Sequence, residues 1–479
     1  MLTGLPNLAN LSLVLLLADL GLVGAVAVHI LLNKHDPRAI IGWLAVCLLT
    51  PFIGALLYFV FGINRVQTRA QRLAARSPFT TGESPLDLSH EIDGEHASEL
   101  LPLARIAGRI TGRPLLAGNR VDCLHDGEQA YPAMLAAMAQ ARETLFLASY
   151  IFDTGATGQR FIAALAAAVR RGVDVRVLID GVGQLSSRPR ASRMLRDCGV
   201  PVARFIPPRL VPPQFSINLR NHRKLLVVDG REGYTGGMNI SHDHLAADQT
   251  NPKRITDLHF RLQGPIVGAM QQTFLEDWGF ITEDRTPVSA TPAQREGEAC
   301  CRTIVDGPNE DLDQMIRVLT AVICAARHRI GIMTPYFLPP NGLLTALRAA
   351  ALRGVEVTVL LPGQPDHAFV QWASTNVIGL LLHDGAQVAY RPPPFAHSKL
   401  LLIDDTYVLL GSANLDPRSL RLNFELGVEV FDPGLSGELW CHFEEARARA
   451  RPLTEADLTG RSLPVRLRDA LAWACSPYL

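Results

Sequence analysis

Two ten-residue strings decide the fold: "NHRKLLVVDG" at Asn221–Gly230 and "AHSKLLLIDD" at Ala396–Asp405. Each string holds a histidine, a lysine two residues later and an aspartate five residues after the lysine. The lysines are unusual here, because only four of the 46 lysine and arginine residues are lysines and two of those four lie in these strings. Arginine serves wherever a positive charge alone is needed, so these two positions select the compact ammonium group.

The strings belong to a longer repeat that predicts the fold class. Both copies run from a DG turn, at Asp126 and Asp306, through an Ala/Leu-rich helix to an apolar strand, and this alternation is typical of an α/β fold. A period this long indicates a duplicated domain. We therefore expect two homologous lobes, 101–295 and 296–479, each a mixed β-sheet flanked by helices, about a pseudo-twofold axis. Five positions recur with a constant offset of 175 residues: His222 and His397, Lys224 and Lys399, Asp229 and Asp404, Gly236 and Gly411, Asn239 and Asn414.

Each string reads as the first strand of a β-hairpin. Residues two apart in a strand project to the same face, so the histidine and lysine of each string point together. The glycines of the return strand allow close backbone approach, and Asn239 and Asn414 then offer amide groups nearby. We count Asp229 and Asp404 with the catalytic motif, although their odd spacing from the lysine favours an anchoring role over a reacting one.

Two such faces around one cavity suit a phosphodiester substrate. A neutral imidazole attacks phosphorus without the charge repulsion that an anionic nucleophile meets. Two lysines and two amides stabilise the charge that develops on the phosphoryl oxygens, and the second histidine protonates the leaving alkoxide. This chemistry requires neither a metal nor an organic cofactor.

The N-terminal region predicts a membrane hairpin. Apolar runs at about 8–32 and 39–63 are each long enough to cross a hydrocarbon layer of roughly 30 Å. Four arginines (Arg65, Arg69, Arg72, Arg76) follow the second run, whereas the loop between the runs holds only Lys34 and Arg38. By the positive-inside rule everything after the hairpin is cytoplasmic. We expect a hairpin with its basic flank at 1–76 and a linker at 77–100; a buried hairpin of a soluble protein is the alternative.

Composition narrows the function classes. The formal net charge is zero, which offers no electrostatic argument for nucleic acid. The eight cysteines show no CxxC spacing, so we expect free thiols in a reducing compartment. His242 and His244 in "SHDH" suggest a metal, but two loop histidines without clear partners are commonly solvated, and we expect no metal site.

At the two strings the sequence resembles the phospholipase D superfamily, whose mark is a duplicated HxKxxxxD motif. More narrowly, "RNHRKLLVVDGREGYTGGMNIS", "HSKLLLIDDTYVLLGSANLDPRSLRLNFELGVEV" and the membrane segment "HDPRAIIGWLAVCLLTPFIGALLYFVFGINR" resemble the bacterial cardiolipin synthases. The resemblance implies an enzyme of the bacterial inner membrane that joins two phosphatidylglycerol molecules and releases glycerol.

The resemblance also implies residue roles. His222 is expected to be the nucleophile and His397 the general acid. Lys224 and Lys399 are expected to bind the phosphoryl group with Asn239 and Asn414. Family members carry an acidic residue after each block that orients the histidine, and we expect Glu425 in "NFE" and Asp257 in "DLHF" to take those places beside the substrate.

Other functions remain open at this stage. Water competes with any acceptor alcohol, so a phospholipase D-type hydrolase, or a transferase with another donor or alcohol, is the nearest alternative. A nuclease of the same superfamily is a second class, and a non-catalytic membrane scaffold a third. The neutral charge and the hairpin argue against the nuclease, and the completeness of both motifs argues against the scaffold. The sequence is silent on oligomeric state.

Overall fold

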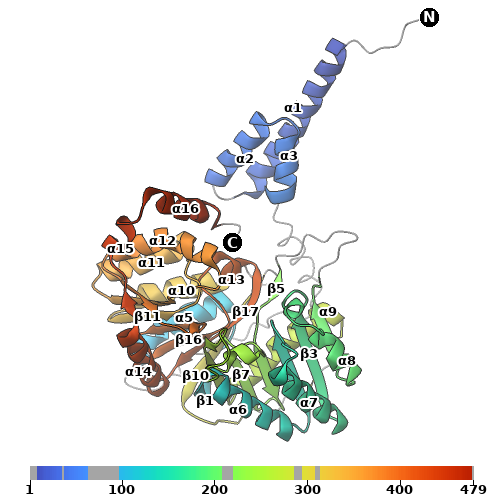
Figure 1. The fold of residues 1–479 in the computed structure, drawn as a ribbon, viewed down its shortest axis with the longest axis vertical. Helices are drawn as coiled ribbons and strands as arrows, with labels where there is room; N and C mark the ends of the chain where they lie inside the picture. Colours follow the sequence, from blue (N-terminus) through green and yellow to red (C-terminus); the bar gives the residue numbers. More distant parts are fainter. Residues whose placement is uncertain are drawn as a thin grey trace, which may run out of the picture. The chain divides into compact units, whose positions relative to one another are not determined.

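The computed structural model describes residues 8–34, 37–62, 97–207, 219–284, 288, 294–307 and 313–476. The chain divides into two compact units, Met1–Arg69 and Ala70–Leu479 (Figure 1). The basic flank and nearly all of the predicted linker lie outside the described residues.

The N-terminal unit is built around one long apolar helix, α1 (Leu8–Asn33). At 1.5 Å per residue, α1 is about 39 Å long, which exceeds the thickness of a hydrocarbon layer. Its segment Leu13–Asn33 has a mean hydropathy of 2.3 and is only 11% buried. Length and composition therefore fit α1 to cross a membrane.

The second apolar run is helical but interrupted, so the prediction of one helix over 39–63 is only partly confirmed. It consists of α2 (Pro37–Leu49), α3 (Ile53–Leu57) and a π-helical turn, η1 (Tyr58–Gly62). Pro51 has no backbone N–H to continue a helix, and Phe52 has a φ of 56°.

The break folds the second run back on itself. The rings of Trp43 and Tyr58 lie 5.4 Å apart, a separation that one straight helix could not give over 15 residues. Asp19 of α1 accepts a hydrogen bond from the Phe52 backbone N–H at 2.8 Å, and His29 Nδ1 lies 2.9 Å from the Tyr58 hydroxyl. Asp19 is thus a helix-contact residue that satisfies the break in the neighbouring run.

The larger unit contains the duplicated architecture predicted from the repeat. Each half repeats one order of strands and helices along the chain (Figure 1). The first half comprises β1 (Leu116–His125), α6 (Asp126–Gln140), β2 (Thr144–Ser149), α7 (Ala156–Arg170), β3 (Asp174–Asp180), η3 (Gly183–Ser186), α8 (Ala191–Asp197), β4 (Val202–Phe205), β5 (Arg220–Asn221), β6 (Leu225–Val228), β7 (Glu232–Gly236), η5 (His242–His244), β8 (Ile255–Thr256), β9 (Leu258–Gln263) and α9 (Ile266–Thr282). The second comprises β10 (Ala299–Asp306), α10 (Gln314–Ala325), β11 (Arg329–Met333), α11 (Asn341–Leu352), β12 (Glu356–Pro362), α12 (Ala368–His383), β13 (Gln387–Arg391), β14 (Phe395–Ala396), β15 (Leu400–Ile403), β16 (Tyr407–Gly411), α13 (Pro417–Arg421), β17 (Asn423–Phe431) and α14 (Pro433–Arg449), followed by β18 (Arg451–Pro452), α15 (Glu455–Thr459) and α16 (Leu463–Ala474).

The sheet makes the pseudo-twofold visible in its strand order. From β13 to β4 the order is β13-β12-β11-β15-β16-β17-β10-β1-β9-β7-β6-β2-β3-β4, which reads equivalently from both ends. In each half three parallel strands adjoin an antiparallel set that contains the predicted hairpin, β6–β7 or β15–β16. The halves join where β1 pairs antiparallel with β10. The predicted mixed α/β fold is confirmed.

Two short crossing strands hold the halves together near the histidines. β5 of the first half pairs with β17 of the second, and β14 of the second pairs with β8 of the first. Each crossing strand immediately precedes one of the HxK strings. Each half therefore positions the motif of the other.

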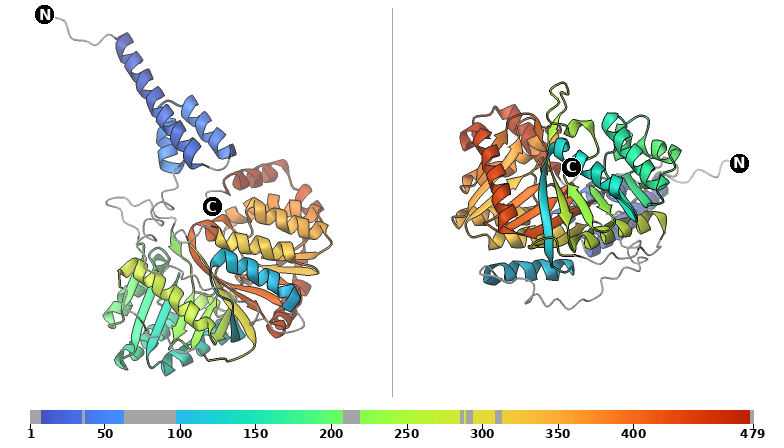
Figure 2. Two further views of the ribbon diagram at one scale, coloured as in Figure 1. Left: turned by 180° about the vertical axis from the view of Figure 1, so that it is seen from behind. Right: turned by 90° about the horizontal axis from the view of Figure 1, so that it is seen from below.

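One further helix crosses the predicted lobe boundary. α5 (Ala97–Thr111) precedes the first half in the chain, yet it lies beside α10 of the second half (Figure 2, left). Its Ala104 is fully buried in the second-half core, and the Ala104 carbonyl accepts a hydrogen bond from Arg302 Nη1 at 2.9 Å. The start of the folded body is thus tied to the second half.

Candidate active site

The two motif histidines are placed by backbone pairing between the halves. The His222 backbone N–H donates to the Phe424 carbonyl of β17 at 2.9 Å. The His397 backbone N–H donates to the Thr256 carbonyl of β8 at 2.8 Å. Both side chains, 12% and 11% exposed, line one cavity of about 560 Å³. The two strings therefore form one site, as the repeat predicts.

A carboxylate from the opposite half orients each imidazole. His222 Nδ1 lies 3.0 and 3.1 Å from the two carboxylate oxygens of Glu425, and His397 Nδ1 lies 2.9 Å from Asp257 Oδ2. A carboxylate at Nδ1 accepts the proton of that nitrogen, which leaves Nε2 unprotonated and free to react. The acid after each block is present, and it serves the histidine of the other block.

The supports of the two acids differ. Glu425 is fully buried and accepts hydrogen bonds from Ser412 Oγ at 2.5 Å and Asn423 Nδ2 at 3.1 Å. Gly237 stands where Ser412 stands in the other half, and a Cβ there would collide with the carboxylate of Asp257. Asp257 instead accepts from the Leu258 backbone N–H at 2.8 Å. Burial acts to raise the pKa of Glu425, but His222, Lys224 and Ser412 outweigh it and hold that pKa below its ordinary value.

Burial keeps both imidazoles neutral in the empty site. Burial lowers the pKa of His222 to about 4, against the opposing effect of Glu425. Burial, together with the nearby Lys399 and Lys224, lowers the pKa of His397 well below its ordinary value. A neutral imidazole is the form that attacks an anionic phosphodiester.

The motif lysines are buried beside the histidines. Lys224 Nζ donates to the His222 carbonyl at 2.7 Å, and Lys399 Nζ donates to the His397 carbonyl at 2.6 Å. Burial lowers the pKa of Lys399 to about 8 and that of Lys224 well below its ordinary value. An entering phosphate would supply the negative charge that favours both ammonium forms.

Asn239 and Asn414 line the same cavity as the histidines. Asn239 Oδ1 accepts from the Ile151 backbone N–H at 3.2 Å, which fixes the orientation of its amide. Arg220 and Arg418 also line the cavity, next to apolar side chains such as Phe369 and Phe395. The cavity thus combines cationic and apolar walls.

Asp229 and Asp404 lie away from this cavity. Each follows the strand that the HxK string opens, at the end remote from the histidine. The Asp229 carboxylate accepts from the backbone N–H groups of Arg142, Glu143 and Thr144. Asp404 does the same for three N–H groups at residues 327–329. We therefore leave both aspartates out of the reacting groups, contrary to their inclusion with the catalytic motif, because their oxygens are engaged in tying the hairpin to the preceding strand.

Two residues that sequence reasoning did not assign also belong to the site. The Tyr150 ring packs edge-on against His222, with 5.1 Å between ring centroids, and Lys224 Nζ lies 5.6 Å from its centre. Its recurrence as Tyr336 at the end of the matching strand was the available signal. His244 is 1% exposed, and its Nε2 accepts from the Asn239 backbone N–H at 3.2 Å.

The expectation of solvated loop histidines is therefore wrong for His244. His242, by contrast, is partly exposed and lies 2.9 Å from Asp248. Donor atoms of His244, Asp257 and His397 lie within 4.8 Å of one another. Because Asp257 and His397 are already hydrogen-bonded to each other, we interpret this group as the support of the reacting imidazole.

Comparisons with known proteins agree with this geometry. A family model described as cardiolipin synthase, PLD-like domain, matches residues 134–278 and 319–447, and one described as phospholipase D-nuclease N-terminal matches 21–62. The major cardiolipin synthase of Bacillus subtilis is 32% identical, over 93% of this chain and 95% of that protein. Cardiolipin synthase A of Pseudomonas aeruginosa is 33% identical, over 97% and 96%. The structure of phosphatidylserine synthase from Haemophilus influenzae aligns with a TM-score of 0.61 at 16% identity, over 79% of this chain and all of that one, which shows a shared fold.

Proposed function

The chain belongs to the cardiolipin synthase family with phospholipase D-like domains, and we propose that it joins two phosphatidylglycerol molecules into cardiolipin and releases glycerol. Family membership makes it a phosphatidyltransferase that acts on phospholipids and associates with a membrane. The observation that carries the finer proposal is the pair of imidazoles on one cavity, each oriented by an acid of the opposite half.

In the first step His222 Nε2 attacks the phosphorus of one phosphatidylglycerol. The new N–P bond replaces the bond to the glycerol headgroup, and His397 gives the departing alkoxide its proton. The empty site keeps His397 neutral, and the negative phosphate is what allows it to hold that proton. Glycerol leaves, and a phosphatidyl group remains on His222.

In the second step the terminal hydroxyl of another phosphatidylglycerol attacks the same phosphorus. His397, now neutral, removes the hydroxyl proton as the N–P bond breaks. Lys224 and Lys399, with the amides of Asn239 and Asn414, stabilise the charge on the phosphoryl oxygens in both steps. Cardiolipin forms, and both histidines return to their starting states.

The cavity wall favours a lipid acceptor over water alone. The acceptor carries a second phosphate, and Arg220 and Arg418 line the cavity beside the histidines. Guanidinium groups bind phosphate in a bidentate manner. Exposed Phe369 and neighbouring Phe395 offer an apolar surface to acyl chains.

The decisive experiment supplies purified protein with phosphatidylglycerol labelled in its headgroup. We expect cardiolipin and labelled free glycerol in equal amounts. Phosphatidic acid with glycerol and no cardiolipin would replace the proposal with hydrolysis. A second reaction with added phosphatidylethanolamine tests another donor. His242→Ala is the matched control, because this partly exposed histidine neighbours the site but contacts neither imidazole.

The choice of nucleophile needs its own test. We assign His222 because its carboxylate partner receives two side-chain hydrogen bonds and is the better fixed of the two. A His397→Ala protein should accumulate a phosphatidyl adduct on His222, since the leaving and resolving steps are slowed. An adduct on His397 in a His222→Ala protein, with none in the reverse variant, would exchange the two roles.

We also propose the organisation of the chain around this site. The halves are taken as 101–295 and 296–479, with the membrane segment before residue 77. The catalytic body is placed on the cytoplasmic side of the bacterial inner membrane, because arginines 65, 69, 72 and 76 follow the apolar segment.

A further inference from the structure

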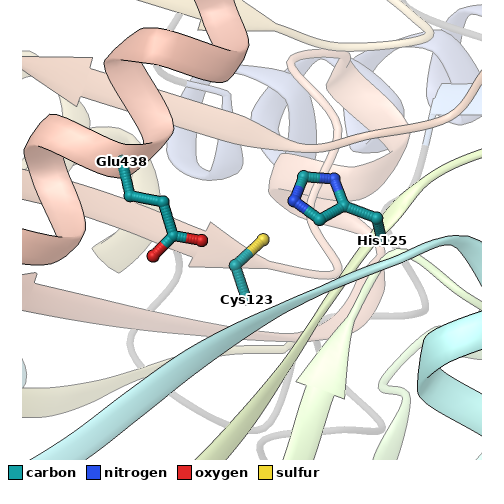
Figure 3. Close-up of side chains that lie close together, drawn as sticks. All are labelled: Cys123, His125 and Glu438. Atoms are coloured by element: carbon teal, nitrogen blue, oxygen red, sulfur yellow. The ribbon is translucent and has the colours of Figure 1, made fainter.

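A group of metal-ligating side chains lies where the two halves meet, apart from the catalytic cavity. Cys123 and His125 are on β1 of the first half, and Glu438 is on α14 of the second. One donor atom from each lies within 4.8 Å of the other two. Figure 3 shows the Cys123 sulfur between the Glu438 carboxylate and the His125 ring.

Regular geometry brings these side chains together. Residues two apart on a strand share a face, so Cys123 and His125 project together towards α14. Residues four apart on a helix also share a face, which places His442 beside Glu438. The rings of His125 and His442 have their centroids 5.0 Å apart. A C-x-H pair on a strand thus faces an E-x-x-x-H pair on a helix.

These groups have no other engagement that accounts for them. Among the residues that the structure describes, no hydrogen bond or ion pair holds the Cys123 thiol, the His125 ring or the Glu438 carboxylate. His442 Nε2 is buried without a hydrogen-bond partner. Burial, with the nearby His125, Arg391 and Arg449, lowers the pKa of His442 to about 4, so its ring is neutral as a ligand must be.

We propose that Cys123, His125, Glu438 and His442 form a site for a divalent transition metal of the zinc class. One thiolate, two imidazoles and one carboxylate suit four-coordinate Zn²⁺. Bond lengths of about 2.0–2.3 Å put tetrahedral ligand atoms about 3.3–3.8 Å apart, so side-chain rotation has about 1 Å to close. Binding replaces the thiol proton with the metal and releases that proton to solvent. Exposed Glu438 leaves a route for entry.

The metal would clamp the two halves behind one catalytic histidine. Asp126 follows His125 directly, and its backbone N–H donates to the Asp257 carbonyl at 3.0 Å. Asp257 returns a backbone hydrogen bond to Asp126 Oδ1 at 2.8 Å, while its carboxylate holds His397. The site itself does not depend on the proposed reaction; only its consequence for His397 rests on the proposed function.

Cobalt(II) provides the test, because a thiolate ligand adds a near-ultraviolet charge-transfer band to the visible bands of a tetrahedral site. The full-length protein in detergent, kept reduced with a phosphine, is stripped with a chelator and titrated with Co²⁺. We expect one tetrahedral, thiolate-bearing cobalt per chain, displaced by Zn²⁺. We also expect Zn²⁺ to raise the thermal unfolding temperature of the stripped protein.

Ligand variants and controls decide the assignment. Cys123→Ser should abolish the charge-transfer band, and Glu438→Gln or His442→Ala should weaken Co²⁺ binding by at least about tenfold. Cys441→Ser, an exposed thiol on the same helix, and His244→Ala, at the catalytic cluster, should leave the spectrum unchanged. Failure of the folded wild-type chain to retain cobalt, or a thiolate band that survives Cys123→Ser, overturns the proposal. Loss of cardiolipin synthesis with an intact cobalt site would count against the proposed function alone.

Discussion

His222 and His397 occupy equivalent positions in the two halves, but their surroundings differ. Both oxygens of Glu425 face His222, and Ser412 and Asn423 hold them there. Asp257 is one methylene shorter, and Gly237 leaves the space that this carboxylate occupies. His397 Nδ1 also lies 3.0 Å from Lys399 Nζ. The duplicated residues provide the reacting groups, while the unduplicated neighbours make the two imidazoles chemically distinct.

The carboxylate of Glu425 should matter most in forming the adduct. In Glu425→Gln the amide leaves the geometry nearly unchanged but removes the charge that stabilises a cationic His222. We expect adduct formation to slow by roughly 10²–10⁴-fold, comparable with loss of positioned acid–base catalysis. Rapid quench of a single turnover in the His397→Ala background measures this step. Ser412→Ala should slow it less, and equal effects would contradict the role given to the charge.

The buried lysines predict an early alkaline limit to activity. A lysine carries its charge only below its pKa, and burial lowers the pKa of Lys399 to about 8 from an ordinary value of 10.5. kcat/KM, which reports the free enzyme, should therefore fall as the pH rises through about 8. Bound phosphate favours the ammonium form, so the alkaline limb of kcat should lie at higher pH than that of kcat/KM. Initial rates in mixed micelles measure both, and a kcat/KM limb at the ordinary lysine pKa would contradict burial as the cause.

At the scale of elements, the sequence was informative wherever pattern is local. Alternation and a DG or DD turn predict β6–β7 and β15–β16, and the structure has both hairpins. The crossing strands β5 and β14 could not be predicted, because each is two residues long and pairs with a strand of the other half. The break in the second apolar run was missed because hydropathy does not register Pro51 or the acceptor that Asp19 supplies.

The aspartates of the two motifs belong to this scale, because they join elements. Asp404 accepts three backbone N–H groups, and each lost acceptor leaves a donor to be satisfied by water. We expect Asp404→Ala to destabilise the folded body by about 2–4 kcal/mol. The folded fraction should keep most of its transferase activity. Thermal unfolding and activity per folded molecule check both statements, with Asp404→Asn as the milder control. A fully stable but inactive Asp404→Ala protein would make Asp404 a reacting group after all.

At the scale of the whole molecule, the constant offset between the strings predicts two lobes and one shared site, and the mirrored sheet has that form. What the offset could not predict is the exchange of carboxylates, since Glu425 and Asp257 stand 168 residues apart, a different spacing from that of the histidines they serve. Insertions and deletions between the motifs remove this signal from a repeat. Distance in the chain likewise hid the approach of β1 to α14.

The N-terminal unit makes a prediction about membrane topology that differs from the one drawn from hydropathy. Two straight crossings would return the chain to the side of its N-terminus, whereas the second run folds back at Pro51–Phe52 and ends near His29, close to where it began. With α1 as the one crossing, Lys34, Arg38 and the four arginines after residue 63 all fall on one side, which strengthens the positive-inside argument for a cytoplasmic body. We therefore expect the N-terminus on the outer face. Fusions to alkaline phosphatase, active outside, and to green fluorescent protein, fluorescent inside, check this at the N-terminus, after Lys34 and after Gly62. Both internal positions should report the cytoplasm and the N-terminus the periplasm. An outer signal after Lys34 with a cytoplasmic signal at the other two positions would restore the two-crossing hairpin.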